Sequence, residues 1–331
     1  MDVSLVIPTY NRANLIGKTI PALASQVTGD FTYEVIFVSN GSSDSTVEVL
    51  NEAAKRYSGR IRYYSIAPTG GPSAPRNVGI RAAQGDAVII LDDDVLPDPD
   101  LMLRHAEFHK AHPEPQHAAL GTVYVPPDLL LDPISFFHAF PYDRIRTPDR
   151  LGYLYFWTCH ISVKRKFMLE MGMFDENFLY FEDVLCGHRL EQNGMHLHFL
   201  PAARGQHLHQ LKASGIPAKG LFTGRWLHAF EQVVSDRAMR EKFGILSMDL
   251  PPKVLLRRIL NRVGFSLLNN RAAMAGLKWM GANRSSRNRV SDLYYYVIFR
   301  GNMLAGYREA KRQARRTDLK RAVKEWVDRG E

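Results

Sequence analysis

Short β-branched runs alternate with helix-forming segments over the first hundred residues. Each run ends in turn residues, and the segments after the first two runs, residues 13–26 and 45–57, have the composition of helices. The four runs are residues 3–11, 33–43, 61–67 and 86–94. This order predicts an α/β fold with a doubly wound, mostly parallel sheet, helices on both faces, and functional groups at the carboxyl ends of the strands.

Strand-like and helix-like segments continue up to about residue 215. We expect further strands and helices in the order helix 100–112, strand 118–125, strand 155–165, helix 165–172, helix 182–194 and strand 195–201. The proline- and aromatic-rich stretch 126–155 predicts loop and short helix. After residue 215 apolar residues recur at three- and four-residue spacing among Lys and Arg, as in 252–270, which predicts a basic helical subdomain.

The positive charge of the chain is concentrated near its C-terminal end. The formal net charge is +9, whereas residues 253–331 alone contain 19 Lys and Arg against 6 Asp and Glu. Large apolar residues accompany these cations, a combination typical of helices that lie on anionic membranes. The alternative is an ordinary subdomain that packs its apolar face internally. None of the usual nucleic-acid-binding folds is indicated, so we expect no nucleic acid partner.

Cysteine usage and hydropathy indicate the compartment. The two cysteines, Cys159 and Cys186, are too few for a disulfide framework and fit a reducing compartment, although one bridge between them stays open. The N-terminus lacks the basic and apolar regions of a signal peptide, and no apolar run approaches the roughly 18 residues of a spanning helix. We therefore expect a cytoplasmic protein that does not cross a membrane.

Three consecutive aspartates, Asp92, Asp93 and Asp94, directly follow the apolar run 88–91. Their mutual repulsion is costly unless a cation lies nearby, and Asp92 and Asp94 point to the same side of an extended chain. A divalent ion is therefore expected here. The alternative is a solvated turn in which the carboxylates cap the following segment.

Six blocks, taken together and in their order, resemble those of the family 2 glycosyltransferases, which have the GT-A fold. The blocks are SLVIPTYNR, VIFVSNGSSDST, GGPSAPRNVGI, AVIILDDDVLPDPDLM, MGMFDENFLYFEDVLCGHRL and ARGQHLH. The resemblance implies a GT-A catalytic domain at 1–214, with a nucleotide-binding half at 1–100 and an acceptor-binding half at 101–214. It leaves the basic helical region 215–331 unexplained.

The resemblance implies a nucleoside diphosphate sugar as the donor. The residues expected to contact it are Pro8, Thr9, Tyr10, Arg12, Asn40, Arg76, Asp92 and Asp93. Tyr10 is suited to stacking on the base and Arg12 to reaching a phosphate, although Arg12 is also compatible with a simple surface position. The alternative to a donor contact for Arg76 is a salt bridge at the protein surface. Asn40 stands where many relatives have an aspartate that contacts uracil, which leaves the base open.

The resemblance also implies a metal site. Asp94 is the expected ligand of Mn²⁺ or Mg²⁺, and of the two histidines His207 and His209 we favour His207 as a further ligand. Imidazole suits Mn²⁺ better than Mg²⁺. The alternative is an ordinary strand with polar residues on one face, because residues 196–198 show the same alternation.

The acidic pair Glu182 and Asp183 occupies the place of the catalytic base in the family. The resemblance implies that Asp183 removes the acceptor proton, while Glu182 contacts the acceptor or supports the site. Acidic residues at the start of a helix are also favoured by the helix dipole alone. Trp157 and His160 either shape a pocket or belong to the core.

These expectations converge on an inverting, metal-dependent sugar transfer to a glycan or lipid-linked acceptor, in cell-envelope polysaccharide synthesis. The protein would then work in the cytoplasm. A peripheral position at the inner face of the plasma membrane is the alternative. Two rivals remain. A sugar-nucleotide nucleotidyltransferase would typically carry a Gly-rich phosphate loop, which is not visible, and a non-catalytic glycan- or membrane-binding module would not need both Asp94 and Asp183.

Overall fold

The computed structural model describes most of the chain. The described residues are 1–127, 134, 140–208, 212–234, 236–243, 253, 256, 263–265, 267–268, 270–282 and 288–314. The chain divides into two compact units, one made of Met1–Pro126 and Ala139–His209 and the other of Pro127–His138 and Gln210–Glu331. The two units are described separately, as unit 1 and unit 2.

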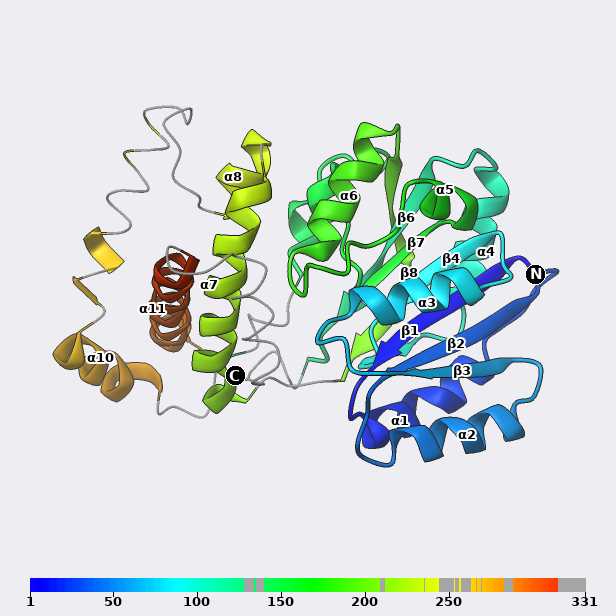
Figure 1. Cartoon of the computed structure of the whole chain (residues 1–331), viewed down its shortest axis with the longest axis horizontal. Coiled ribbons are helices and arrows are strands. Elements are labelled where there is room, and N and C mark those ends of the chain that lie inside the picture. Colours follow the sequence, from blue (N-terminus) through cyan, green and yellow to red (C-terminus); the bar gives the residue numbers. More distant parts are fainter. Residues whose placement is uncertain are drawn as a thin grey trace. The chain divides into compact units, whose positions relative to one another are not determined.

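Unit 1 is built around one mixed sheet with the order β3-β2-β1-β4-β7-β6-β8-β5 (Figure 1). The strands are β1 (Val3–Thr9), β2 (Tyr33–Asn40), β3 (Ile61–Ile66), β4 (Ala87–Leu91), β5 (Val95–Pro97), β6 (His117–Tyr124), β7 (His160–Lys164) and β8 (His196–His207). The pairs among β1 to β4 and the pair β6–β8 are parallel, whereas β7 pairs antiparallel with β4 and β6, and β5 pairs antiparallel with β8. The predicted mostly parallel sheet is confirmed.

Helices cover both faces of this sheet because its inner strands are apolar on both sides. The helical elements are α1 (Ala13–Ala24), α2 (Thr46–Arg56), α3 (Ser73–Ala82), α4 (Leu101–Ala111), η3 (Tyr142–Arg144), η4 (Tyr153–Tyr155), α5 (Arg165–Glu170) and α6 (Glu182–Gln192). Leu5 and Ile7 of β1 pack in a core with α1, α2 and α4, whereas Val6 packs in a second core with α3, α5 and α6 (Figure 1). Alternate residues of one strand thus serve opposite cores.

Two expected elements differ in extent from those observed. The segment 155–165 is a strand only from His160, because Trp157 belongs to an aromatic cluster with Tyr142 and Tyr155 and donates its indole N–H to the Leu154 carbonyl at 2.9 Å. The strand expected at 195–201 instead continues to His207 as β8, because β6 and then β5 offer pairing partners along most of its length. Cys159 and Cys186 are buried and free, so they form no bridge.

Unit 2 is helical, which confirms the helical region expected near the C-terminus. Its described elements are η5 (Ala213–Gly215), α7 (Ile216–Val233), α8 (Arg237–Phe243), α10 (Arg271–Leu277), the single π-turn η6 (Lys278–Ala282) and α11 (Arg289–Ala314). Helices α7 and α11 pack closely through glycines: a Cβ on Gly224 would lie 1.9 Å from the Met303 carbonyl oxygen, and one on Gly306 would lie 2.2 Å from that of Leu221. Arg225 pairs with Glu309 across the same contact at 3.1 Å.

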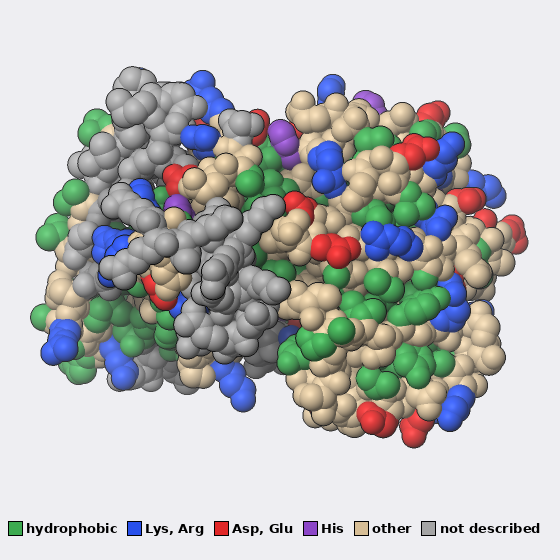
Figure 2. Space-filling view, viewed as in Figure 1, with side chains coloured by type: hydrophobic (Ala, Val, Ile, Leu, Met, Phe, Trp, Pro, Cys, Tyr) green, Lys and Arg blue, Asp and Glu red, His purple; other side chains and the backbone are tan. Residues whose placement is uncertain are grey.

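The surface of unit 2 mixes apolar and basic side chains. Figure 2 shows Lys and Arg interspersed with hydrophobic side chains over its described part. Trp279 is 82% exposed and Leu267 is 70% exposed. Among the helices that the structure describes, none combines the length and the apolar character needed to cross a membrane.

Candidate active site

The polar residues that follow β1 and β4 meet at the carboxyl edge of the sheet. Because β1 and β4 are parallel neighbours, Thr9 at the end of β1 donates its hydroxyl to Oδ2 of Asp93 at 2.7 Å. Nε of Arg12 lies 3.7 Å from the other carboxylate oxygen of Asp93, and the Tyr10 ring beside them is 56% exposed. This edge therefore combines an anchored carboxylate, a guanidinium and an aromatic ring open to solvent.

Asp93 is held in an environment that opposes its ionisation. Burial raises the pKa of Asp93 to about 6, against the lowering effect of the Thr9 hydrogen bond, and the Asp94 carboxylate raises it further. Burial also raises the pKa of Asp92, opposed by Arg76 and reinforced by Asp94 and Asp93. The nearby guanidinium groups of Arg76 and Arg12 offset the burial of Asp92 and Asp93 only in part.

Asp94 and His207 form a pair suited to a divalent ion. Strand β5 places Val95 opposite His207 of β8, so the side chain of Asp94 approaches His207, with Oδ1 lying 3.6 Å from Nε2. Asp94 is buried, and its Oδ1 has no hydrogen-bond partner among the described residues. A buried carboxylate oxygen left without a hydrogen bond next to an imidazole is a donor set that fits Mn²⁺. His209 lies outside the described residues.

Arg76 connects the acidic run to the start of α6. Its Nη1 lies 2.6 Å from Oε1 of Glu182, and its Nη2 lies 3.4 Å from Oδ1 of Asp92. Both Arg76 and Glu182 are buried, and the guanidinium also lies over the Phe174 ring, 5.5 Å from its centroid. Arg76 is therefore not the surface salt bridge that the sequence left open.

Asp183 lies beside this ion pair in the first turn of α6. It is half-buried, and one carboxylate oxygen accepts the N–H of Val184 at 2.8 Å. Burial raises the pKa of Asp183, the Glu182 carboxylate raises it further, and Arg76 opposes the shift. Burial raises the pKa of the Cys159 thiol, and the carboxylates of Asp92, Asp183 and Asp94 raise it further.

Comparison with known proteins relates this architecture to a known family. Residues 4–164 match the family model described as Glycosyl transferase family 2. This segment belongs to that family. Over 222 residues the chain is 30% identical to validoxylamine A glucosyltransferase of Streptomyces hygroscopicus subsp. jinggangensis, which covers 58% of this chain and 52% of that protein. Over 110 residues it is 34% identical to poly(ribitol-phosphate) beta-glucosyltransferase of Bacillus spizizenii, covering 33% of this chain and 17% of that protein. The chain thus spans about half or less of the length of these relatives.

Solved structures show that the fold of this chain is of the GT-A type, as the sequence predicted. Staphylococcus aureus TarS 1-349 in complex with UDP superposes with a TM-score of 0.54 at 17% identity, covering 96% of this chain and 92% of that chain. The mannosyltransferase PcManGT from Pyrobaculum calidifontis, in complex with GDP-Man and Mn²⁺, gives a TM-score of 0.60 at 17% identity, covering 93% and 86%. At these identities the likeness concerns the fold.

Three other residues named in the sequence analysis, Asn40, Pro8 and His160, differ in their surroundings. Asn40 is buried and bonded to the loop after β3: its Oδ1 accepts from the N–H and hydroxyl of Thr69, and its Nδ2 donates to the Gly71 carbonyl, all at 3.0 Å. Pro8 is half-buried within β1, next to Thr9. His160 is completely buried, so it belongs to the core of unit 1 and not to a pocket wall.

A buried histidine network in this domain escaped the sequence interpretation. Nε2 of His105 lies 2.9 Å from Nε2 of His160, and the Ser162 hydroxyl lies 2.9 Å from Nδ1 of His105 and 2.8 Å from Nε2 of His109. Burial lowers the pKa of each of these histidines, so the network is neutral. Its signal was the four-residue spacing of His105 and His109, which places two imidazoles on one side of α4.

Proposed function

We propose that this protein transfers a sugar from a nucleoside diphosphate sugar to a hydroxyl group of a glycan or lipid-linked acceptor, with inversion, in cell-envelope polysaccharide synthesis. The observation that carries the proposal is the Arg76 bridge, which gathers the acidic run after β4 and the carboxylates of α6 around one guanidinium. A donor-side group and a proton acceptor are thereby held in one rigid arrangement, as a group transfer requires.

The donor class is supported by two solved neighbours. One is described in complex with UDP-GlcNAc and the other with GDP-Man and Mn²⁺. We propose that Tyr10 stacks on the base, that Arg12 reaches a phosphate, and that Pro8, Thr9 and Asn40 border the nucleoside. Asp92 and Asp93 would face the ribose and the donor sugar.

Asp94 and His207 would hold a Mn²⁺ or Mg²⁺ ion. Such an ion would supply positive charge to the pyrophosphate, which needs it both when bound and when it leaves. The buried, unbonded Oδ1 of Asp94 supports this assignment. Arg12 would add a second positive charge on the donor side.

Asp183 would act as the general base. Its carboxylate takes the proton of the acceptor hydroxyl, the hydroxyl oxygen attacks the anomeric carbon, and the bond from that carbon to the nucleoside diphosphate breaks with its electron pair on the leaving phosphate. A raised pKa makes a carboxylate a better proton acceptor near neutral pH. Glu182, neutralised by Arg76, would orient the start of α6.

A panel of nucleotide sugars tests this function. The protein is mixed with UDP and GDP sugars and Mn²⁺, and the melting shift and the release of nucleoside diphosphate are measured. At least one donor should both stabilise the protein and be turned over. Formation of pyrophosphate from a nucleoside triphosphate and a sugar phosphate would instead establish a nucleotidyltransferase, and binding without turnover by any donor or acceptor would establish a non-catalytic module.

We also propose that unit 2 rests on an anionic membrane surface at the inner face of the plasma membrane. Exposed Trp279 directly follows Lys278, and exposed Leu267 precedes Arg271 by four positions, a mixture of apolar and cationic residues that such surfaces bind. Sedimentation with anionic vesicles should be strong at low salt, fall as salt rises, and weaken in Trp279→Ser. No sedimentation, or sedimentation that is independent of vesicle charge, would favour a subdomain that only packs internally.

A further inference from the structure

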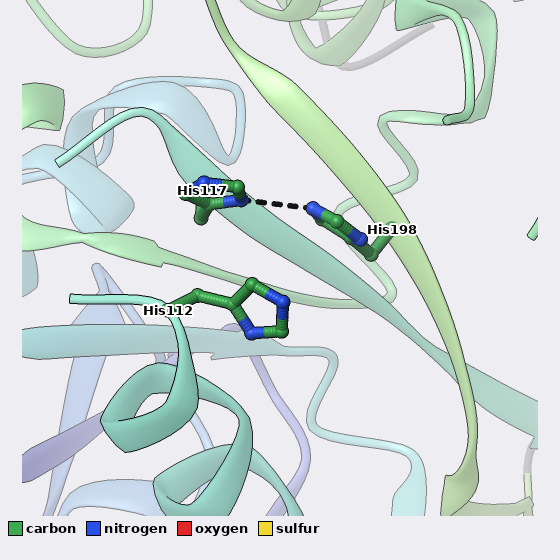
Figure 3. Close-up of side chains that lie close together, drawn as sticks. All are labelled: His112, His117 and His198. Carbon is green, nitrogen blue, oxygen red and sulfur yellow. Dashed lines mark hydrogen bonds between the residues drawn. The ribbon is translucent and has the colours of Figure 1, made fainter. Parts of the chain in front are cut away.

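Three half-buried histidines meet at the other end of the sheet from the acidic run (Figure 3). His117 begins β6, His198 lies in β8 and His112 directly follows α4. One ring nitrogen of each lies within 4.8 Å of the others, and Figure 3 shows His117 and His198 facing each other above the ring of His112. Strand β6 runs in the same direction as β4 through two antiparallel steps, so its start lies at the amino edge, away from the glycosyltransferase site.

The polar contacts of two of these rings prepare them as ligands. Nδ1 of His112 lies 3.0 Å from the Phe108 carbonyl oxygen, which can only accept, so Nδ1 carries the hydrogen and Nε2 keeps its lone pair. Nε2 of His117 lies 3.6 Å from a Glu114 carboxylate oxygen. A carbonyl or carboxylate behind the imidazole is the usual support of a metal-ligating histidine.

Ring packing alone does not account for the arrangement. Phe108 stacks on His112 with centroids 4.4 Å apart, which explains the position of that ring but not the direction of its free nitrogen. His117 and His198 face each other through Nδ1 and Nε2 at 2.8 Å, where only one hydrogen fits between two lone pairs. If His117 carries its hydrogen on Nε2, toward Glu114, and His198 carries its hydrogen on Nδ1, the two nitrogens that face each other both keep their lone pairs. Both neutral rings can then bind an ion without losing a proton.

We propose that His112, His117 and His198 bind a divalent transition-metal ion, with Zn²⁺ as the best fit. Three imidazoles and one open position form a set that Zn²⁺ accepts readily, with water completing the tetrahedron. The ion joins the end of α4, the start of β6 and the first residues of β8. Its role is structural: it fastens the proline-containing loop 112–117 to the sheet.

Zinc binding is measured in an Asp94→Asn background, so that the metal site proposed for sugar transfer does not contribute. Equilibrium dialysis with elemental analysis should find about one Zn²⁺ per chain, and added Zn²⁺ should raise the melting temperature. Introducing His198→Gln or His112→Gln should weaken Zn²⁺ binding at least about tenfold and abolish the thermal gain. The matched control is His188→Gln, which replaces a half-buried histidine packed on Tyr153 in the same unit and should change neither.

The proposal is overturned if the Asp94→Asn protein binds no Zn²⁺ at micromolar concentrations, or binds it equally well with and without His198→Gln and His112→Gln. Two replacements are used because His198 lies within the sheet and His112 at a helix end. A variant that does not fold at one position still leaves the other to decide. Loss of sugar transfer in Asp94→Asn has no bearing on this result, so the two metal proposals fail separately.

Discussion

Arg76 and Glu182 form a buried ion pair, with Nη1 and Oε1 2.6 Å apart, although they lie 106 positions apart in the chain. The pair joins α3, which covers the parallel half of the sheet, to the first residue of α6. Because Arg76 also lies 3.4 Å from Asp92, the helix that presents Asp183 and the acidic run after β4 depend on one guanidinium. Changes at Arg76 should therefore affect both stability and the site.

Arg76→Met should destabilise the protein severely. Removing one partner of a buried pair leaves an unpaired charge and typically costs about 3–5 kcal/mol. Arg81→Met is the matched control, because Arg81 makes an exposed 3.9 Å contact with Glu176 that should contribute at most about 1 kcal/mol. Urea denaturation of both variants measures the difference. Equal stability of the two would show that the buried pair does not hold α6 in place.

Asp93→Asn should stabilise the ligand-free protein at pH 8 but not at pH 4. The folded-state pKa of about 6 lies above the ordinary value of 3.8, so the folded state binds more protons than the unfolded state between these values. The parent therefore loses stability as pH rises from about 4 to 6, by an upper limit of about 3 kcal/mol for a shift of this size, and the variant does not. Melting temperatures across this range give the test. A constant difference between parent and variant would show that Asp93 titrates normally.

Asp94→Asn should weaken binding of nucleoside diphosphate, and EDTA should weaken it in the parent. The reason is the loss of the cation that we propose between Asp94, His207 and the pyrophosphate. Calorimetry with Mn²⁺ and with EDTA measures both effects, and EDTA should change little in Asp94→Asn. Identical affinities for the parent with and without EDTA would remove the ion from donor binding.

Asp183→Asn should separate binding from turnover. Asparagine has the size of aspartate but does not take a proton, so donor affinity should stay nearly unchanged while transfer falls by about 10² to 10⁴-fold. The transfer rate of the parent should increase with pH through an apparent pKa above the ordinary aspartate value, because the base works only when ionised. Rate and nucleotide affinity are measured on the same preparation. A rate of sugar transfer close to that of the parent would show that Glu182 or another group is the base.

Gly224→Ala should destabilise unit 2. Its Cβ would meet the backbone carbonyl oxygen of Met303, and such overpacking costs about 1–3 kcal/mol, more than the gain in helix propensity. Gly17→Ala in α1 is the matched control, because its Cβ would meet nothing within 4 Å and should add roughly 0.5–1 kcal/mol. Thermal unfolding followed by circular dichroism distinguishes them. A stabilising effect at both positions would mean that α7 and α11 have room to separate.

The sequence by itself determined the α/β class, the sheet edge that carries the polar residues and the place of the acidic run. These follow from local signals: the residue period of strands and helices, the turn residues after each strand, and charges at a strand end. The six ordered blocks added the glycosyltransferase family and the GT-A fold, which the family match and the solved structures confirmed.

Only the tertiary structure decided which of these residues touch. The pairing of β5 with β8 brings His207 to Asp94, and the packing of α3 near α6 brings Arg76 to Glu182. The polar alternation at 196–198 is compatible with an ordinary strand. The pairing of β6 with β8 is what brings His117 next to this segment. Strand register and helix packing depend on contacts between segments far apart in the chain, and no local residue pattern records which segment will be the partner.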